Sequence, residues 1–462
     1  MSAVRSPQLR RAASGRGAAA GFDRRLILPM VLGSILNPIN SSMIAVALVP
    51  IGAAFGAPPS RTAWLVTGLY LATAIGQPVV GRLVDAHGPR RLYLLGTGLV
   101  GVAGLFGVLA PSLGWLIAAR VLLGLGTSAA YPASMYLTRS EARRTGQESP
   151  GAVLTALAVA NQTVAVIGPT LGGLLIGVAG WRAVFTVNLP LSLACLVLGA
   201  LRLPRTGRSA AVAGVDLPGM GLFAAMLLAL MAFLMDPVPR HWYLLPLLLL
   251  AGAGFAVREL RCAEPFVDLR LLAGNRPLLA TYLRQLLSYT ASYAFLYGFT
   301  QWLEQGRGLS AATAGLLLLP LSVSGLAVSW LTGRHPALRG KLLVGAGFQL
   351  LGCAGLLLTH GGSAGWLLAA LGVLMGIPQG LNGLANQNAL YRQAPAERMG
   401  SAAGLLRTFM YLGALGASAA DAAFFPHGAT TGGLHLLALF MAGGAVLLLV
   451  VTALDRSLST TD

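Results

Sequence analysis

The chain has 462 residues, of which 56% are hydrophobic and only 10% are charged. Soluble domains carry roughly a quarter charged residues, so this composition excludes a water-soluble globular protein. A formal net charge of +18 would suggest nucleic acid as a partner of a soluble protein. Here the positive residues lie between apolar segments, so we expect no nucleic-acid partner. The cysteines Cys195, Cys262 and Cys353 lie far apart, which predicts neither a disulfide framework nor a metal site.

The first segment, residues 1–25, is rich in Arg, Ala, Gly and Ser and has no apolar stretch of its own. Such a composition is typical of a disordered tail, which we expect in the cytoplasm. A cleaved signal peptide is not expected, because the apolar segment that follows is longer than the ~7–15 residues of a signal core.

Fourteen apolar segments follow, each long enough to cross the ~30 Å core of a bilayer. Their approximate bounds are 26–56, 61–82, 91–110, 112–138, 151–179, 181–203, 215–235, 241–258, 278–303, 311–333, 340–359, 364–391, 400–425 and 432–454. Backbone amides cannot remain unpaired in hydrocarbon, so these segments are predicted to be α-helices. The fold class is therefore an all-α, polytopic integral membrane protein.

The positive residues predict the orientation in the membrane. With the amino terminus inside, 25 of the 32 Lys and Arg residues fall in cytoplasmic segments and three fall within helices. Only four lie outside, namely Arg61, Arg182, Arg240 and Arg307. This asymmetry follows the positive-inside rule and predicts that both termini are cytoplasmic. The excess charge also favours contact with anionic lipid.

A weak internal repeat supports a two-part organisation. The loop from Gly81 to Arg91, after the second segment, has a counterpart from Gly333 to Lys341 after the tenth. Residues 26–203 and 271–456 would then be corresponding six-helix bundles, and residues 204–270 would contain two inserted helices. A transporter built from repeats places its substrate site between the halves.

The strongest motif is Gly81-Arg-Leu-Val-Asp85-Ala-His-Gly88-Pro-Arg90-Arg91. It resembles the signature loop between helices 2 and 3 of the major facilitator superfamily. Glycines permit a tight turn, Asp85 can face the positive end of a neighbouring helix, and Arg90 and Arg91 can pair with acids across the cytoplasmic face. The resemblance implies a conformational latch formed by Gly81, Asp85, Gly88, Arg90 and Arg91. The alternative is a solvated turn.

Two further elements resemble motifs of the same superfamily. Leu116-Ile-Ala-Ala-Arg120, followed by Gly124-Leu-Gly126 and Tyr131-Pro132, is similar to the motif of helix 4, where the family links the arginine to proton coupling. A structural role for Arg120 on backbone carbonyls is the alternative. Gly168-Pro169-Thr-Leu-Gly172-Gly173 is similar to the helix 5 motif of exporters. It implies a hinge at Gly168, Pro169, Gly172 and Gly173, with ordinary small-residue packing as the alternative.

The run Trp181-Arg182-Ala-Val-Phe185-Thr-Val-Asn188-Leu-Pro190 resembles the start of helix 6 in the fourteen-helix drug:proton antiporters. This resemblance implies the major facilitator fold with two six-helix bundles plus two inserted helices. The chain departs from that family in helix 1, where Asn40 stands in place of the usual aspartate. Asn40 cannot release a proton, so Asp421 becomes the preferred proton site. Solvation of Asp421 near the outer surface is the alternative.

Arg120, Arg284 and Arg407 lie within helices, where few acids accompany them, so the cavity is expected to be net positive. An anionic or neutral polar substrate is then favoured over a cationic dye. The candidate cavity residues are Asn40, Gln77, Asn161, Arg284, Tyr293, Gln379 and Arg407. Tyr289, Tyr293 and Tyr297 recur every four residues and are predicted to share one helix face.

These observations predict a monomeric secondary transporter that exports drugs or natural products by alternating access. Proton influx is the expected energy source, because no phosphate-binding Gly-x4-Gly-Lys-Ser/Thr loop is present. We expect no enzyme activity, cofactor or metal. Thirty-one arginines against one lysine are typical of a GC-rich bacterial genome, which predicts the inner membrane of a bacterium. A proton-independent uniporter or exchanger is one alternative, and a membrane sensor or enzyme on a transporter scaffold is the other.

Overall fold

The computed structural model describes residues 22–57, 59–62, 64–146, 151–205, 216–235, 239–263, 265–309, 311–333, 335, 337–426 and 428–458. In these ranges the chain is helical, and its single β-bridge joins Pro426 to Gly428. Most of the expected tail lies outside the described residues. Its last part differs from the expectation, because Asp23 caps the short 3-10 helix η1 (Arg24–Leu26) and its backbone N–H donates to Glu141. An ordered start of this kind fixes the entry into the first long helix.

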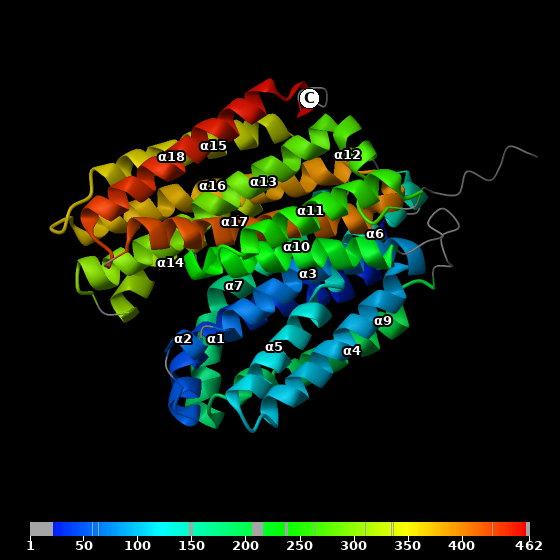
Figure 1. The fold of residues 1–462 in the computed structure, drawn as a ribbon, viewed down its shortest axis with the longest axis horizontal. Coiled ribbons are helices and arrows are strands. Elements are labelled where there is room, and N and C mark those ends of the chain that lie inside the picture. The colour runs from blue at the N-terminus through cyan, green and yellow to red at the C-terminus, as the bar shows by residue number, and fades with distance from the viewer. Residues whose placement is uncertain are drawn as a thin grey trace, which may run out of the picture.

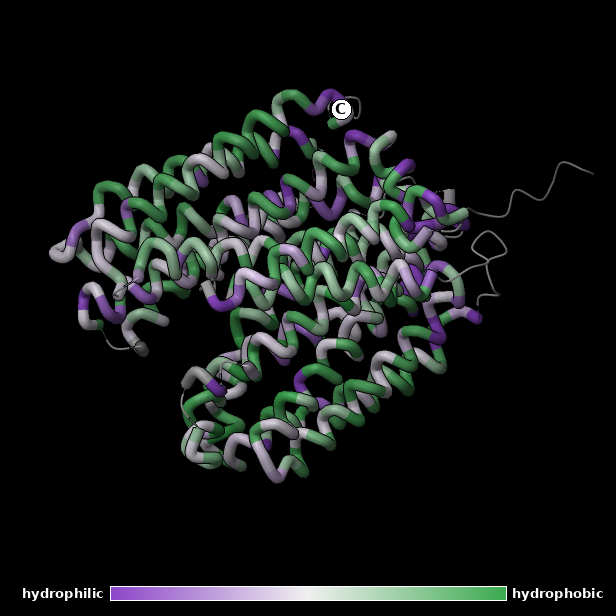
Figure 2. Tube along the Cα trace, viewed as in Figure 1, coloured by the Kyte–Doolittle hydropathy of each residue, from purple (hydrophilic) through white to green (hydrophobic). Residues whose placement is uncertain are grey.

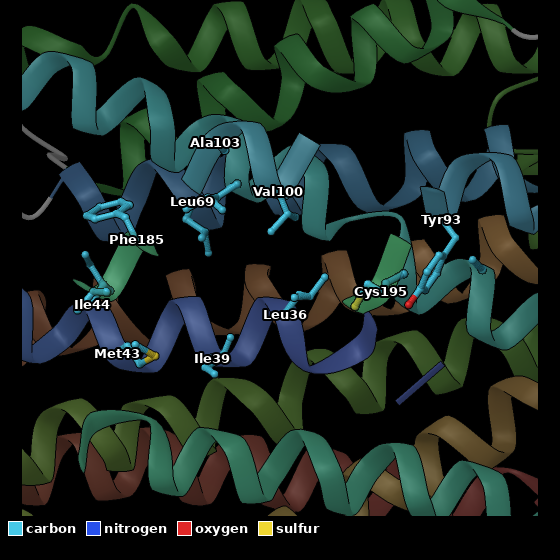
Figure 3. Close-up of a cluster of buried hydrophobic side chains, with 14 of the residues drawn as sticks. Leu36, Ile39, Met43, Ile44, Leu69, Tyr93, Val100, Ala103, Phe185 and Cys195 are labelled. Atoms are coloured by element: carbon cyan, nitrogen blue, oxygen red, sulfur yellow. The ribbon is translucent and has the colours of Figure 1, made fainter. Parts of the chain in front are cut away.

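A first bundle is formed by residues 26–203. It contains α1 (Ile27–Phe55), α2 (Pro59–Thr62), α3 (Trp64–His87), α4 (Pro89–Val108), α5 (Leu113–Thr127), α6 (Ala130–Thr145), α7 (Gly151–Ala179), α8 (Ala183–Thr186) and α9 (Asn188–Arg202). One apolar cluster, drawn from these residues alone, holds the bundle together. Figure 3 shows its centre, where Leu36 and Ile44 of α1 face residues of α3, α4, α8 and α9. The Tyr93 hydroxyl donates to the Pro29 carbonyl and so joins α4 to α1.

A second bundle is formed by residues 276–454. It contains α13 (Arg276–Ala294), the π-helical segments η3 (Phe295–Phe299) and η4 (Trp302–Gly306), α14 (Ala311–Thr332), α15 (Leu338–Leu357), α16 (Gly365–Gln393), η5 (Ala396–Arg398), α17 (Met399–Phe424) and α18 (Thr431–Leu454), followed by η6 (Arg456–Leu458). Its own apolar cluster runs from Ala291 to Met441. The helix expected over 278–303 is therefore α-helical only as far as Ala294.

Between the bundles in sequence lies an inserted pair, α10 (Leu217–Met235) and α11 (Leu244–Arg261), with the short η2 (Pro239–His241) and α12 (Leu269–Gly274). α10 packs against α11, and it also contacts α3 of the first bundle and α17 of the second. In Figure 1 the pair lies beside the line along which the two bundles meet. The inserted pair is thus positioned to touch both bundles at once.

Eleven helices of the described chain are long and apolar enough to cross a membrane. The segments expected at 241–258, 278–303 and 400–425 are helical but are not among those eleven. They carry polar and charged residues such as Arg258, Arg284 and Arg407, which lower their mean hydropathy. Apolar length alone therefore does not give the expected fourteen crossings.

The two ends of the molecule differ. At one end lie the last residues of α3 and α6, the first residues of α17 and both ends of the described chain, and we call this end the latch face. The opposite end, with the α1–α2 and α17–α18 connections, is the far face. In Figure 1 the bundles meet at the latch face, on the right, and their ribbons diverge toward the far face. Figure 2 shows hydrophilic residues concentrated at the latch face, with an apolar belt between the two ends.

Candidate functional site

The latch motif joins the two bundles at the latch face. Asp85, at the end of α3, accepts hydrogen bonds from the backbone N–H groups of Gly400 and Ser401, each at 2.8 Å, and from the Ser401 hydroxyl. Gly400 and Ser401 form the first turn of α17, where free N–H groups and the helix dipole favour a negative charge. α3 and α17 pack closely here, since a Cβ atom on Gly81 would collide with the Gly400 backbone. The carboxylate therefore caps a helix of the other bundle, in the manner expected from the sequence.

Arg90 and Arg91 of the motif do not pair with acids across the interface as expected. Arg90 donates to the Ala200 carbonyl at 2.6 Å within the first bundle, and Arg91 is exposed. Gly88 has φ +88° and starts the turn into α4, a conformation that favours glycine. An ion pair across the interface joins Arg143 of α6 to Glu397 at 2.7 Å. Its arginine lies outside the motif, so the motif itself gave no sign of it.

A second polar site lies inside the first bundle. Asn40 and Asn188 exchange two side-chain hydrogen bonds, of 2.6 and 3.0 Å. Arg120 donates from Nε to the Leu65 carbonyl at 2.8 Å and from Nη1 to the Asn40 carbonyl at 3.0 Å. All three polar side chains are at most 2% exposed. Asn40 was expected to line the cavity, but its side chain is hydrogen-bonded to Asn188 instead. The hydrogen bonds shown for Arg120 are to backbone carbonyls rather than to a carboxyl group.

Six tyrosines gather between the bundles, and we call them the tyrosine cluster. They are Tyr70 (α3), Tyr131 (α6), Tyr289 and Tyr293 (α13), Tyr297 (η3) and Tyr411 (α17). The α13 rings form a row with centroids 6.0 and 5.4 Å apart, so the shared face predicted from their spacing is confirmed. Tyr70 and Tyr411 meet across the bundles at 5.6 Å. Phe299 and Trp302, further along, are instead buried in the core of the second bundle.

Arg407 lies against this cluster. Its guanidinium carbon is 4.1 Å from the centroid of the Tyr131 ring, a cation–π contact between α17 and α6. Tyr289, Tyr293 and Tyr411 are also close enough to interact with its charge. Tyr131 was part of the helix 4 motif, so the sequence contained a sign of this role. Tyr70 and Tyr411 carried no such sign.

Asp421 lies in the far half of α17. It is only 3% exposed, and neither carboxylate oxygen has a hydrogen-bond partner. It packs against Gly298 of η3, where π-helical geometry replaces the regular α-helix, and Tyr297 interacts with its charge. π-helical turns are frequent at functional sites. The alternative of a solvated Asp421 is wrong for this structure.

The other candidate cavity residues occupy different places. Arg284 is fully buried and forms an ion pair with Asp455 at 2.7 Å, so it lies inside the second bundle rather than in the cavity. Gln77 is buried where α3 packs on α17, and its backbone contacts Gly404. Asn161 donates to the Leu157 carbonyl and to Ser34, and Gln379 lies half-buried beside Gly325 of α14. Of the seven, Tyr293 and Arg407 are the two that the structure brings together.

The expected hinge lies where α7 packs on α1. A Cβ atom on Gly168 would collide with Ser42, and one on Gly172 would press on Val46 and Met43. Pro169 lies within α7, which continues unbroken from Gly151 to Ala179. A Cβ atom on Gly173 would meet nothing within 4 Å. Gly168 and Gly172 therefore permit the close approach, and the motion expected at this motif stays a prediction.

Comparisons with known proteins agree with this geometry. Over 435 residues the chain is 33% identical to the uncharacterised MFS-type transporter YwoD of Bacillus subtilis, covering 91% of this chain and 94% of that protein. It is 28% identical to the tetracenomycin C resistance and export protein of Streptomyces glaucescens, covering 84% of this chain and 73% of the other.

The fold is similar to the crystal structure of the human organic anion transporter MFSD10, with a TM-score of 0.67 and 15% identity over 93% of this chain and 99% of that one. The Major Facilitator Superfamily model matches residues 30–418. Relatives and structural neighbours are transporters and not enzymes. The chain with the latched helices and the buried acid therefore belongs to the Major Facilitator Superfamily of membrane transporters.

Proposed function

We propose that this chain is a proton-driven exporter of small organic molecules in the inner membrane of a bacterium. In this proposal it is a monomer that crosses the bilayer fourteen times, and both termini and the latch face are cytoplasmic. The positive-inside distribution of Lys and Arg supports the orientation. The Asp85 cap on α17 supports alternating access, because the latch must release when the bundles open toward the cytoplasm.

The observation that carries the proton coupling is Asp421, buried with both oxygens unpaired. Burying an unpaired carboxylate is very costly, so the neutral, protonated acid is favoured in this latch-closed state. An antiporter needs that form after it has released its substrate outside and taken up a proton. In the opposite state, access to water or to a positive charge would favour release of the proton inside.

The tyrosine row connects this acid to the proposed substrate site. Tyr297 of η3 interacts with the charge of Asp421, and Tyr289 of α13, about two turns earlier, interacts with that of Arg407. A substrate that binds Arg407 would press on the same row of rings that contacts the acid. Competition between proton and substrate would then act through α13 and its π-helical segment.

The substrate we propose is aromatic, with an anionic or neutral polar group. Arg407 supplies the positive charge and the tyrosine cluster supplies aromatic faces and hydroxyl groups. The similarity to an export protein for tetracenomycin C supports an organic natural product as cargo. Arg407→Gln should reduce the affinity for anionic compounds about tenfold, and should leave neutral analogues of the same shape nearly unchanged.

The test uses purified protein in liposomes, screened with aromatic acids and their neutral analogues. An imposed pH gradient should drive accumulation by the wild type and not by Asp421→Asn, and both proteins should exchange substrate when no gradient is present. Glu397→Gln, which removes an exposed carboxylate at the latch face, should keep the response to the gradient. A full response in Asp421→Asn would contradict the proposal.

A proton-independent exchanger is the rival, and the neutral Asn40–Asn188 pair favours it, because no acid remains at that position of the first bundle. The exchanger model predicts that substrate gradients drive transport by the wild-type protein and that pH gradients drive no movement of substrate.

A further inference from the structure

The inserted pair contacts more of the molecule than a peripheral addition would. One apolar cluster at the latch face combines residues from all three parts of the chain. The pair contributes Phe223 and Phe255, the first bundle contributes Met135, and the second bundle contributes Tyr391 and Met399. The other two large clusters are each confined to one bundle. Closure at the latch face therefore buries apolar surface of the inserted pair together with that of both bundles.

The segment that follows α11, Phe266–Asp268, attaches to the second bundle, and we call it the strap. Asp268 forms an ion pair with Arg398 at 3.0 Å. Arg398 immediately precedes α17, whose first turn binds Asp85. Phe266 and Val267 also line a pocket together with Ser401. The strap thus lies directly on the helix end that the latch captures.

Glu259, near the end of α11, connects the strap to the first bundle. Its Oε2 atom accepts a hydrogen bond from the Val267 backbone N–H at 2.9 Å. Its Oε1 atom has no hydrogen-bond partner, although the residue is only 1% exposed. The buried guanidinium of Arg82, on the latch helix α3, interacts electrostatically with Glu259 and with Asp85. One cation of the latch motif is therefore shared between the latch carboxylate and the inserted pair.

A second carboxylate, that of Asp216, lies close to Glu259. Asp216 Oδ2 and Glu259 Oε1 both lie against Gly219, within about 5 Å of each other, and neither is hydrogen-bonded. Arg258 binds the other oxygen of Asp216, at 2.8 Å. Two carboxylates held this close repel each other unless a positive charge or a proton compensates them. Arg258 compensates the charge of Asp216, which leaves the Glu259 carboxyl group as the one that interacts with Arg82 of α3.

We propose that Glu259 and Asp268 are positioning residues of the latch, so that the inserted pair holds the latch-closed state from both sides. Glu259 orients Arg82 beside Asp85 on α3, and Asp268 fixes Arg398 at the start of α17. Opening toward the latch face must break one of these attachments. The inference rests on the proposed alternating access and assigns the inserted pair a part in it.

Hydrogen–deuterium exchange of the full-length protein tests this proposal without substrate or pH gradient. The amides of Gly400 and Ser401 are protected while they bind Asp85, so their exchange rate measures the fraction of molecules with an open latch. Glu259→Gln should raise that rate about two- to fivefold, because it weakens the electrostatic interaction of this buried carboxyl group with Arg82. Asp268→Asn should raise it about two- to fivefold, because its ion pair is partly exposed.

The control is Glu141→Gln, which removes a latch-face carboxylate that pairs with Arg144 inside the first bundle. It should leave the exchange of Gly400 and Ser401 unchanged. The charge-reversed double variant Asp268→Arg/Arg398→Asp should restore slow exchange. Unchanged exchange in both Glu259→Gln and Asp268→Asn would overturn the proposal, as would an equal rise throughout α15 and α18, which would show a general loss of stability. Because this readout involves no transport, its failure is distinct from a failure of the proposed proton coupling.

Discussion

Two buried polar sites, one from each bundle, are opposite in character. In the first bundle, Asn40, Asn188 and Arg120 are joined by hydrogen bonds to one another and to helix carbonyls, and of their side-chain nitrogen and oxygen atoms Nη2 of Arg120 alone lacks a partner. In the second bundle, Asp421 has no hydrogen bond to either oxygen and lies against a π-helical segment. Satisfied networks make a structure rigid, whereas an unsatisfied buried group is costly and persists where function requires it. The comparison favours the second bundle for the proposed proton chemistry and the first for a rigid framework.

The largest effect is expected where a buried charge loses its partner. Arg284→Met should destabilise the protein by about 3–5 kcal/mol, because it leaves Asp455 without its buried ion-pair partner. Thermal unfolding in detergent measures the loss, and Arg284→Met/Asp455→Leu should recover most of it. Arg284 would instead be a cavity residue, as the sequence suggested, if the single variant kept its stability and lost affinity for anionic substrates.

A smaller loss is expected if Asn40 of the first bundle is replaced by an acid. Asn40→Asp removes the amide that donates to Asn188 and to the Leu36 carbonyl, and it should cost about 1–3 kcal/mol of stability. The same unfolding assay measures it, with Asn161→Asp on the neighbouring α7 as a half-buried control that should change less. Equal stability of Asn40→Asp and wild type would show that the pair is not the rigid site described here.

The opposite sign is expected at Asp421. Asp421→Leu replaces an unpaired buried carboxyl group by an apolar side chain and should stabilise the protein by about 1–2 kcal/mol while abolishing proton-driven transport. A stabilised, uncoupled variant would mark Asp421 as a functional residue whose burial is unfavourable. Destabilisation would show that the acid holds the fold together, and the contrast between the two sites would be lost.

The smallest effect is expected at the exposed pair of the latch face. The hydrogen bond from Arg143 lowers the pKa of Glu397 below its usual value. A lowered carboxyl pKa stabilises the folded protein at pH values above the ordinary pKa of glutamate. That stability is lost as the pH falls through the lowered pKa. Both side chains are about half exposed, so Glu397→Gln should cost about 0.5 kcal/mol or less at pH 7, and less at pH 3 than at pH 7. Unfolding at the two pH values measures the difference.

Sequence predicted what local patterns determine. Apolar length placed the helices, because a bilayer permits few other structures, and the four-residue spacing placed Tyr289, Tyr293 and Tyr297 on one face. The position of Asp85 at a neighbouring helix end followed from the chemistry of its motif. Contacts between residues far apart in the sequence could not be predicted from local patterns. Arg284 and Arg407 look alike as arginines inside helices, but Arg284 meets Asp455, 171 residues away, and Asn40 meets Asn188, 148 residues away.

The most direct test of the central claim measures protons rather than substrate. Purified protein in weakly buffered detergent solution, with a pH-indicating dye, is mixed with a transported compound identified in the liposome screen. If Asp421 exchanges its proton for substrate, wild-type protein will release protons on binding and Asp421→Asn will bind the compound without releasing any. Equal proton release by both proteins, or none by the wild type, would contradict the assignment of proton coupling to Asp421.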